Sequence, residues 1–312
     1  MSGTVHETEH QVKVRAPAAT AYRLIADVAN WSWIFPTTVH AEKLAGNDRA
    51  DRIGVWTTTD GTVNHWVGLR ELDPVRLRVG YRQETARPPV AEMGGAWIFE
   101  PISAEECLVR LVHDYRAAEE DPGVLQWIAD VLDRLSTAEI AAFQAGAELA
   151  AGQPDRLLSF ADTVPIVGRV ADVYEFLRDP RRWVGRVPDV VEAEISRDVA
   201  GVQTVATRVR TGKGTHASAL IRVCLPPTAI AYRHFAVPPL ASVHTGEWLL
   251  RQQGDTTLAT SRHTVVFDEQ GIAAVLGAEA GLAQAREFAR RELAAGGIAV
   301  LEAAGRWIEQ KA

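Results

Sequence analysis

Hydrophobic and polar positions change their period several times along the chain, and the changes come twice in the same order. Alternating stretches such as HQVKVRA are typical of strands with one buried face. Helical periodicity follows in PAATAYRLIADVANW and again in RVADVYEFLRDPRRW, and Pro17 lies in the first turn of the earlier helix. Short strands separated by turn residues come next. Each half then ends in a long helix rich in Ala, Glu and Leu, about 122–149 and about 271–310.

The order recurs because the chain contains an internal repeat. The matching positions lie 152 residues apart and include Tyr22 and Tyr174, Trp31 and Trp183, Pro36 and Pro188, Glu42 and Glu194. A repeat of this length has the size of a whole domain. Gly152 and Pro154 interrupt the first long helical pattern. The sequence therefore predicts two domains, 1–152 and 153–312.

The fold class follows from what each copy has to bury. A sheet and an amphipathic helix each need one apolar face covered. We therefore expect an α+β fold in each domain, with a curved antiparallel sheet wrapped around the long C-terminal helix. Such a sheet leaves an internal cavity between itself and the helix, where a small ligand binds.

Composition narrows the function classes. The formal net charge of −7 argues against a broad basic face, so we expect no nucleic-acid partner. No apolar run is long enough for a membrane span, and the N-terminus lacks a signal-peptide pattern, so we expect a cytoplasmic protein and no membrane partner. Two distant cysteines, scattered histidines and the lack of a phosphate-binding glycine motif predict no metal and no cofactor.

Several segments carry a family resemblance. NWSWIFPTTVHAE, HWVGLRELDPVRLRVGYRQE, GGAWIFEP and VRLVHDYRA resemble the aromatase/cyclases of bacterial type II polyketide synthases. The tandem layout resembles the di-domain members of that family, which belong to the Bet v 1-like or START-like helix-grip superfamily. The resemblance implies an enzyme that directs the regiospecific first-ring aldol cyclisation of a poly-β-ketone and its dehydration to an aromatic ring. It also implies two kinds of partner: the acyl carrier protein that holds the chain, and other synthase subunits.

Two other functions fit the same fold class, because fold alone does not decide function. One is a non-catalytic START-like carrier of a lipid, a quinone or another flat hydrophobic ligand. The other is a structural subunit of the synthase. Arg70 beside Trp66 favours the enzyme, because a lipid carrier has little need to bury a guanidinium.

Trp66, Gly68 and Arg70 share one face of a predicted strand. The resemblance implies that an arginine four residues after a tryptophan is the key pocket residue. Its fork of donors suits a developing oxyanion, and Gly68 would leave room for substrate. The alternative is an exposed strand arginine paired with Glu71 or with a cross-strand acid.

Thr38 and His113 are the other catalytic candidates. Single-domain relatives often carry a tyrosine at the position of Thr38, and a threonine there could order a water molecule. His113 suits general acid/base work, although it also fits a buried core histidine. The predicted substrate-binding residues, for which a packing role is the alternative, are Trp31, Trp33, Phe35, Trp66, Gly68, Arg82, Trp97, Phe99, Tyr115, Arg222 and Trp248.

The second copy keeps the scaffold but changes the chemistry. Arg70 matches Arg222, whereas Trp66 matches Ser218. The second domain therefore either supports the first or performs a later step such as dehydration. We expect the first domain to close the ring.

Overall fold

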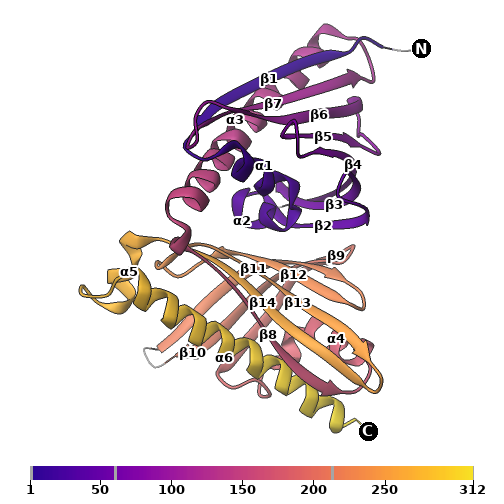
Figure 1. Ribbon diagram of the computed structural model, residues 1–312. Helices are drawn as coiled ribbons and strands as arrows, with labels where there is room; N and C mark the ends of the chain where they lie inside the picture. The colour runs from indigo at the N-terminus through magenta and orange to yellow at the C-terminus, as the bar shows by residue number, and fades with distance from the viewer. Residues whose placement is uncertain (1–2, 60–61, 212–213, 312) are drawn as a thin grey trace. The chain divides into compact units, whose positions relative to one another are not determined.

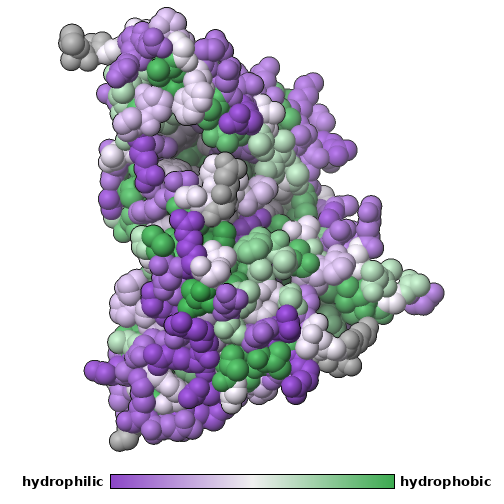
Figure 2. Space-filling view, turned by 180° about the vertical axis from the view of Figure 1, so that it is seen from behind, coloured by the Kyte–Doolittle hydropathy of each residue, from purple (hydrophilic) through white to green (hydrophobic). Residues whose placement is uncertain are grey.

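The computed structural model describes residues 3–59, 62–211 and 214–311. The chain divides into two compact units, Met1–Pro154 and Asp155–Ala312. Each unit has its own sheet and its own long helix (Figure 1). On the face seen from behind, hydrophilic and hydrophobic side chains are intermixed (Figure 2).

The first unit is built on one antiparallel sheet in the order β1-β7-β6-β5-β4-β3-β2. Its strands are β1 (His6–Val14), β2 (Thr38–Gly46), β3 (Ala50–Thr59), β4 (Thr62–Asp73), β5 (Arg78–Gln83), β6 (Val90–Pro101) and β7 (Cys107–Ala117). Its helices are α1 (Ala18–Ala26), the 3₁₀ turn η1 (Val28–Asn30), α2 (Trp31–Ile34) and α3 (Pro122–Gly152). The inner face of the sheet packs on α3.

Local sequence explains these elements. Every second residue of β7, from Cys107 to Ala117, is buried, as period-2 alternation requires. Asp121 caps the start of helix α3, because its carboxylate accepts hydrogen bonds from the backbone amides of Gly123 and Val124. Pro122 occupies the first turn of the helix. Phe143 of α3 is fully buried, with its ring centroid 5.1 Å from that of Trp97 on β6. The α3–sheet contact is therefore the core of this unit.

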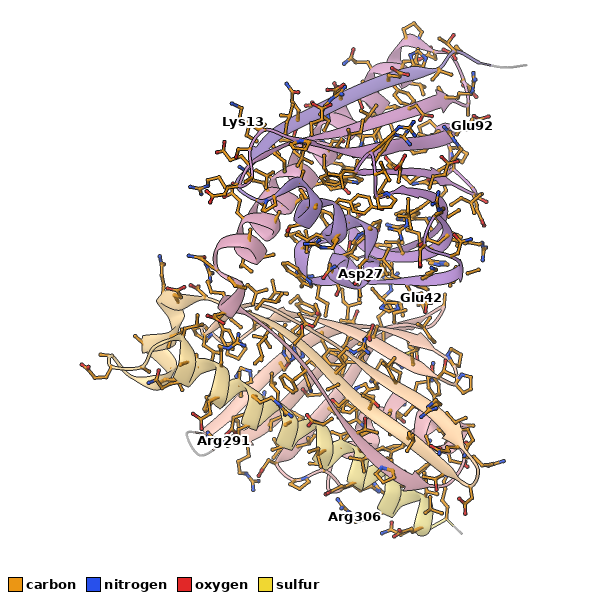
Figure 3. All side chains as sticks on the ribbon, in the orientation of Figure 1. Lys13, Asp27, Glu42, Glu92, Arg291 and Arg306 are labelled. Atoms are coloured by element: carbon orange, nitrogen blue, oxygen red, sulfur yellow. The ribbon has the colours of Figure 1, made fainter. Side chains whose placement is uncertain are left out.

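The second unit repeats the layout with the sheet order β8-β14-β13-β12-β11-β10-β9. Its strands are β8 (Leu157–Val167), β9 (Val190–Val199), β10 (Val202–Thr211), β11 (Gly214–Leu225), β12 (Ala229–Ala236), β13 (Ala241–Gln253) and β14 (Thr256–Phe267). The remaining elements are η2 (Pro154–Arg156), α4 (Val170–Arg178), η3 (Pro180–Trp183), α5 (Glu269–Leu276) and α6 (Leu282–Glu309). Arg291 and Arg306 lie on the exposed side of α6 (Figure 3).

The α+β fold predicted from the sequence is confirmed, with one correction. The single helix expected at about 271–310 is wrong, because α5 ends at Leu276, with Gly277 as its C-cap, and α6 begins at Leu282. Gly277 has a φ of 101°, in the left-handed region that ends helices. Among the described residues, no helix combines the length and the hydropathy that a bilayer span requires.

Candidate functional site

A cavity of about 460 Å³ lies between the sheet and α3 of the first unit. Its apolar lining comes from Ile25, Trp31, Phe35, Pro36, Val55, Trp66, Val79, Met93, Trp97, Leu132, Leu135 and Ala138. Its polar lining comes from Thr37, Thr38, Thr57, Thr58, Thr59, Arg70, Tyr81, Gln83, His113, Ser136 and Glu139. Aromatic walls with a few polar groups are typical of a site for a flat organic ligand.

Two polar side chains of the cavity are joined across the sheet. Tyr81 on β5 and His113 on β7 lie on either side of Gly95 on β6, which pairs with both in register. A Cβ at Gly95 would lie 2.9 Å from the Tyr81 hydroxyl oxygen and 2.0 Å from the Val112 carbonyl oxygen. The glycine therefore leaves the space in which the Tyr81 hydroxyl makes a hydrogen bond with Nδ1 of His113.

Burial keeps this pair uncharged at neutral pH. It lowers the pKa of His113 to about 4 and raises the pKa of Tyr81 well above its ordinary value. The Nε2 atom of His113 is buried and has no hydrogen-bond partner among the described residues. A buried polar atom in that state is available to a ligand or to water.

The sequence interpretation missed the acid of this cavity, Glu139 on α3. Glu139 is partly buried, and protein atoms surround its carboxyl group. The loss of water around the carboxylate raises the pKa of Glu139 to about 7. Ser136, one turn earlier, has a buried hydroxyl without a partner among the described residues. Both lie in a helical stripe with Leu132 and Phe143, so a carboxylate within an apolar stripe was the available signal.

Arg70 is buried and borders the cavity, but its guanidinium is already engaged. Nε and Nη2 donate to the two carboxylate oxygens of Asp51 at 2.9 and 2.7 Å. Nη1 donates to the carbonyl oxygen of Ile25 at 3.0 Å, and Nη2 donates to that of Ala26 at 2.9 Å. These bonds occupy four of the five N–H groups of an arginine.

Of the predicted aromatic residues, four line the cavity: Trp31, Phe35, Trp66 and Trp97. Thr38 and His113 line it as well. Trp33 does not belong to this set of described lining residues, because 31–34 form a helical turn and not a strand. Its side chain is buried, and its ring lies against Gly146 of α3.

Four further predicted residues are not among the described lining residues of this cavity. Arg82 points to the opposite face of the sheet, where it pairs with Asp114 at 2.6 Å. Gly68 accommodates the ring of Trp66 and not substrate, since a Cβ there would lie 2.9 Å from that ring. Phe99 packs against Phe143 and the ring of Tyr22. Tyr115 packs in the cluster with Ile128 and Leu132, and its ring stacks on His6.

Arg222 and Trp248 belong to the second unit and are not among the described lining residues of this cavity. Arg222 is fully buried and donates to the carbonyl oxygens of Leu177 and Arg178. Trp248 belongs to the apolar core of that unit.

The second unit repeats the tyrosine–glycine–histidine arrangement. Tyr232, Gly246 and His263 pair in the same register as Tyr81, Gly95 and His113. Here both ring nitrogens of the histidine have partners. Nδ1 contacts the Tyr232 hydroxyl at 3.2 Å and His244 Nε2 at 3.1 Å, and Nε2 contacts Ser261 Oγ at 3.0 Å.

The helix over the second pair also differs. Gly297 of α6 lies so close that a Cβ there would be 2.7 Å from Ser261 Oγ and 3.4 Å from His263 Nε2. In the first unit the helix presents Glu139 to the cavity instead. The two units therefore share a scaffold but differ in what faces the histidine.

Comparisons with known proteins agree with this geometry. Residues 5–148 match the family model described as "Polyketide cyclase / dehydrase and lipid transport". The chain is 39% identical over 302 residues to the granaticin polyketide synthase bifunctional cyclase/dehydratase of Streptomyces violaceoruber, covering 96% of this chain and 93% of the relative. It is 34% identical to the actinorhodin polyketide synthase bifunctional cyclase/dehydratase of Streptomyces coelicolor, covering 95% of each.

Solved structures give the same result. The di-domain ARO/CYC BexL from the BE-7585A biosynthetic pathway is 41% identical, with a TM-score of 0.89, covering 96% of this chain and 98% of that one. The di-domain ARO/CYC StfQ from the steffimycin pathway is 27% identical, with a TM-score of 0.88, covering 97% and 99%. The predicted enzyme class is thus confirmed over the carrier alternative. The chain belongs to the family of polyketide synthase bifunctional cyclase/dehydratases, and its activity is that of a polyketide cyclase/aromatase.

Proposed function

We propose that the cavity of the first unit closes and dehydrates the first ring of a poly-β-ketone chain held on an acyl carrier protein. The observation that carries this proposal is the placement of Glu139 and the Tyr81–His113 pair in one aromatic-walled cavity. Ring closure needs a flexible chain held in one conformation, a base for a C–H proton and a donor for the new alkoxide. These residues can meet all three needs.

Glu139 is the proposed general acid and base. A pKa of about 7 leaves comparable amounts of carboxylate and carboxylic acid at neutral pH, which favours proton transfer in both directions. As a carboxylate it removes a proton from the methylene between two ketones. The enolate carbon then attacks a second ketone carbon, forming the ring bond and leaving an alkoxide.

The Tyr81–His113 pair is the proposed donor to that alkoxide. Both side chains are uncharged at neutral pH, and His113 Nε2 has no partner among the described residues. A neutral donor in a water-poor cavity stabilises a developing oxyanion without first releasing a counter-charge. Protonated Glu139 returns its proton to the alkoxide, which becomes the ring hydroxyl. The regenerated carboxylate then removes the second α-proton and passes it to that hydroxyl, which leaves as water. Thr38 and the aromatic residues of the wall position the chain.

The second unit is the less favoured location for this chemistry. Its histidine is hydrogen-bonded at both nitrogens, and Gly297 of α6 packs closely over it. Among the described residues, this histidine therefore has no ring nitrogen free to donate to a substrate. We therefore assign the second unit a supporting role.

The chain would enter from one side of the cavity, where Pro36, Thr37, Leu135 and Ala138 line it and are exposed to solvent. This side is the proposed approach of the acyl carrier protein. The relatives are named as parts of polyketide synthases, and this supports partnership with the other synthase components.

Reconstitution tests the proposal. A minimal type II synthase supplied with this protein is expected to give the singly cyclised aromatic product, and without it a mixture of shunt products. Glu139→Gln is expected to give the mixture despite normal folding. A wild-type product profile from the Glu139→Gln protein would contradict the proposal. The same mixture of products with and without the wild-type protein would also contradict it.

A further inference from the structure

The arginine of the central strand is held in the same way in both units. Arg70 donates to the last two carbonyls of α1, those of Ile25 and Ala26. Arg222 donates to the equivalent carbonyls at the end of α4, those of Leu177 and Arg178. Each arginine therefore caps the C-terminal end of a helix, where carbonyls lack partners and the helix dipole is negative.

Each arginine also lies against the tryptophan that follows its helix. The guanidinium carbon of Arg70 is 5.7 Å from the ring centroid of Trp31, and that of Arg222 is 5.7 Å from the ring centroid of Trp183. The Trp31 indole N–H donates to the same Ile25 carbonyl that Arg70 uses. An inward arginine at this position is thus part of the scaffold in both units, and its position alone does not make an active site.

The residue opposite the arginine distinguishes the two units. Asp51 on β3 pairs in register with Arg70, whereas Gln203 on β10 pairs in register with Arg222. Both Asp51 oxygens accept from Arg70, and each side chain of the pair is 2% exposed. Gln203 is fully buried, and its amide donates to Asp198 at 3.0 Å. The second unit therefore buries its arginine without a directly opposed carboxylate.

This comparison separates two possible roles for Asp51. A carboxylate is not needed to bury the arginine, because Arg222 is buried opposite a neutral amide. The hold on the helix end differs, however: Arg222 reaches it through bonds of 2.5 and 3.5 Å, whereas Arg70, with Asp51 beside it, makes bonds of 3.0 and 2.9 Å there. What Asp51 adds is a second anchor for the guanidinium and a compensating negative charge. A substrate oxyanion near Arg70 would meet a nearly neutral ion pair, so the guanidinium is poorly suited to act on the substrate through its charge.

We propose that Asp51 is a positioning residue, which neutralises Arg70 and holds Arg70, Trp31 and the end of α1 in place as one wall of the cavity. The inference rests on the proposed reaction in the first unit, and it revises the catalytic role that the sequence predicted for Arg70. Asp51 acts through Arg70 and Trp31, and Trp31 lines the cavity. Loss of this anchor would let the wall shift, and the chain would then fold in more than one way before ring closure.

The test measures the ratio of correctly cyclised product to shunt products in the reconstituted synthase. Asp51→Asn is expected to lower that ratio by at least about tenfold, because small displacements in a positioning site have large effects. Arg70→Lys, which keeps the charge but loses the fork, is expected to lower it to a similar extent as Arg70→Met. The two substitutions should not add, because both residues act as one unit. The product ratio of the double variant Asp51→Asn/Arg70→Met should lie within about twofold of the lower of the two single-variant ratios.

Controls keep the outcomes distinct. Gln203→Glu, which adds the carboxylate in the second unit, should leave the product ratio unchanged. The pH midpoint of the residual activity in Asp51→Asn should stay near that of the wild type, since Glu139 is untouched. Asp51→Glu, which keeps a carboxylate, should recover part of the lost ratio.

Two results would overturn the inference. One is a wild-type product ratio in folded Asp51→Asn, with loss only in Arg70→Met. The other is a wild-type product ratio in Arg70→Lys, because a positive charge without the fork of donors would then be enough for correct cyclisation. This second result decides the matter even if Asp51→Asn does not fold. If Glu139→Gln also gave the wild-type ratio, the proposed site itself would fail. Loss in Glu139→Gln with no loss in Asp51→Asn and Arg70→Lys would reject only the positioning role.

Discussion

Replacing Glu139 by glutamine should stabilise the first unit at alkaline pH while removing activity. Burial raises the pKa of Glu139 from 4.5 to about 7. At about 1.4 kcal/mol per pKa unit, the ionised carboxylate costs the folded unit roughly 3 kcal/mol at pH 8. Glutamine has nearly the same shape and no charge to desolvate. Glu139→Gln should therefore gain roughly 3 kcal/mol at pH 8.

The sign of the pH dependence is specific to this group. The folded pKa lies above the unfolded value, so the stabilising contribution is fully present below about pH 4.5 and is lost as the pH rises through about 7. At pH 5 the advantage of glutamine should fall below about 1 kcal/mol. A merely structural glutamate, paired in the folded state, would give the opposite trend.

The assay must report on the first unit alone, because two units need not unfold together. Hydrogen exchange, followed by mass spectrometry across a series of urea concentrations, gives a free energy of unfolding for each peptide. Peptides from residues 90–117, which contain β6 and β7, report on the first unit. Equal stabilisation at pH 5 and pH 8, or destabilisation at pH 8, would refute the reasoning about Glu139. Activity in the same samples should fall by about 10²- to 10⁴-fold, as for loss of a general acid/base.

Three further outcomes are expected. Burial lowers the pKa of His234 and of His263 to about 4, so the second unit should lose stability as the pH falls from about 6.5 to 4, seen as smaller protection factors, each relative to the intrinsic exchange rate at that pH, in peptides of β12 and β14. Gly95→Ala should displace Tyr81 and abolish correct cyclisation, measured by product analysis; normal products would contradict the role of the glycine. Phe143→Ala should destabilise the first unit by about 3–5 kcal/mol, measured by urea unfolding, and a cost below about 1 kcal/mol would contradict its core position.

The fold was predictable because its signals are regular. Alternation along β7, the proline and aspartate at the start of α3 and the 152-residue repeat each fix an element or a boundary that sequence pattern can express. The break between α5 and α6 was missed because the residues before and after Gly277 are equally compatible with a helix. Tertiary packing decides that boundary.

The site was predictable only in part. Alternation placed Trp66, Trp97 and His113 on the inner face, and all three line the cavity. Arg82 was predicted to contact substrate, yet the pleat of β5 turns its neighbour Tyr81 towards the cavity. The partnership of Tyr81 with His113 does not follow from sequence spacing, because their strands are separated by β6. Asp51 and Arg70 pair across the neighbouring strands β3 and β4, and the sequence indicated this partner only as an unnamed cross-strand acid.

The central claim is that the chemistry takes place in the cavity of the first unit, and the repeat provides a matched pair of variants to test it. Tyr81→Phe and Tyr232→Phe remove equivalent hydroxyls from the two units. In the reconstituted synthase, Tyr81→Phe is predicted to shift the products to the shunt mixture, and Tyr232→Phe is predicted to keep the wild-type product. The reverse pattern, or a wild-type product from both variants, would contradict the account.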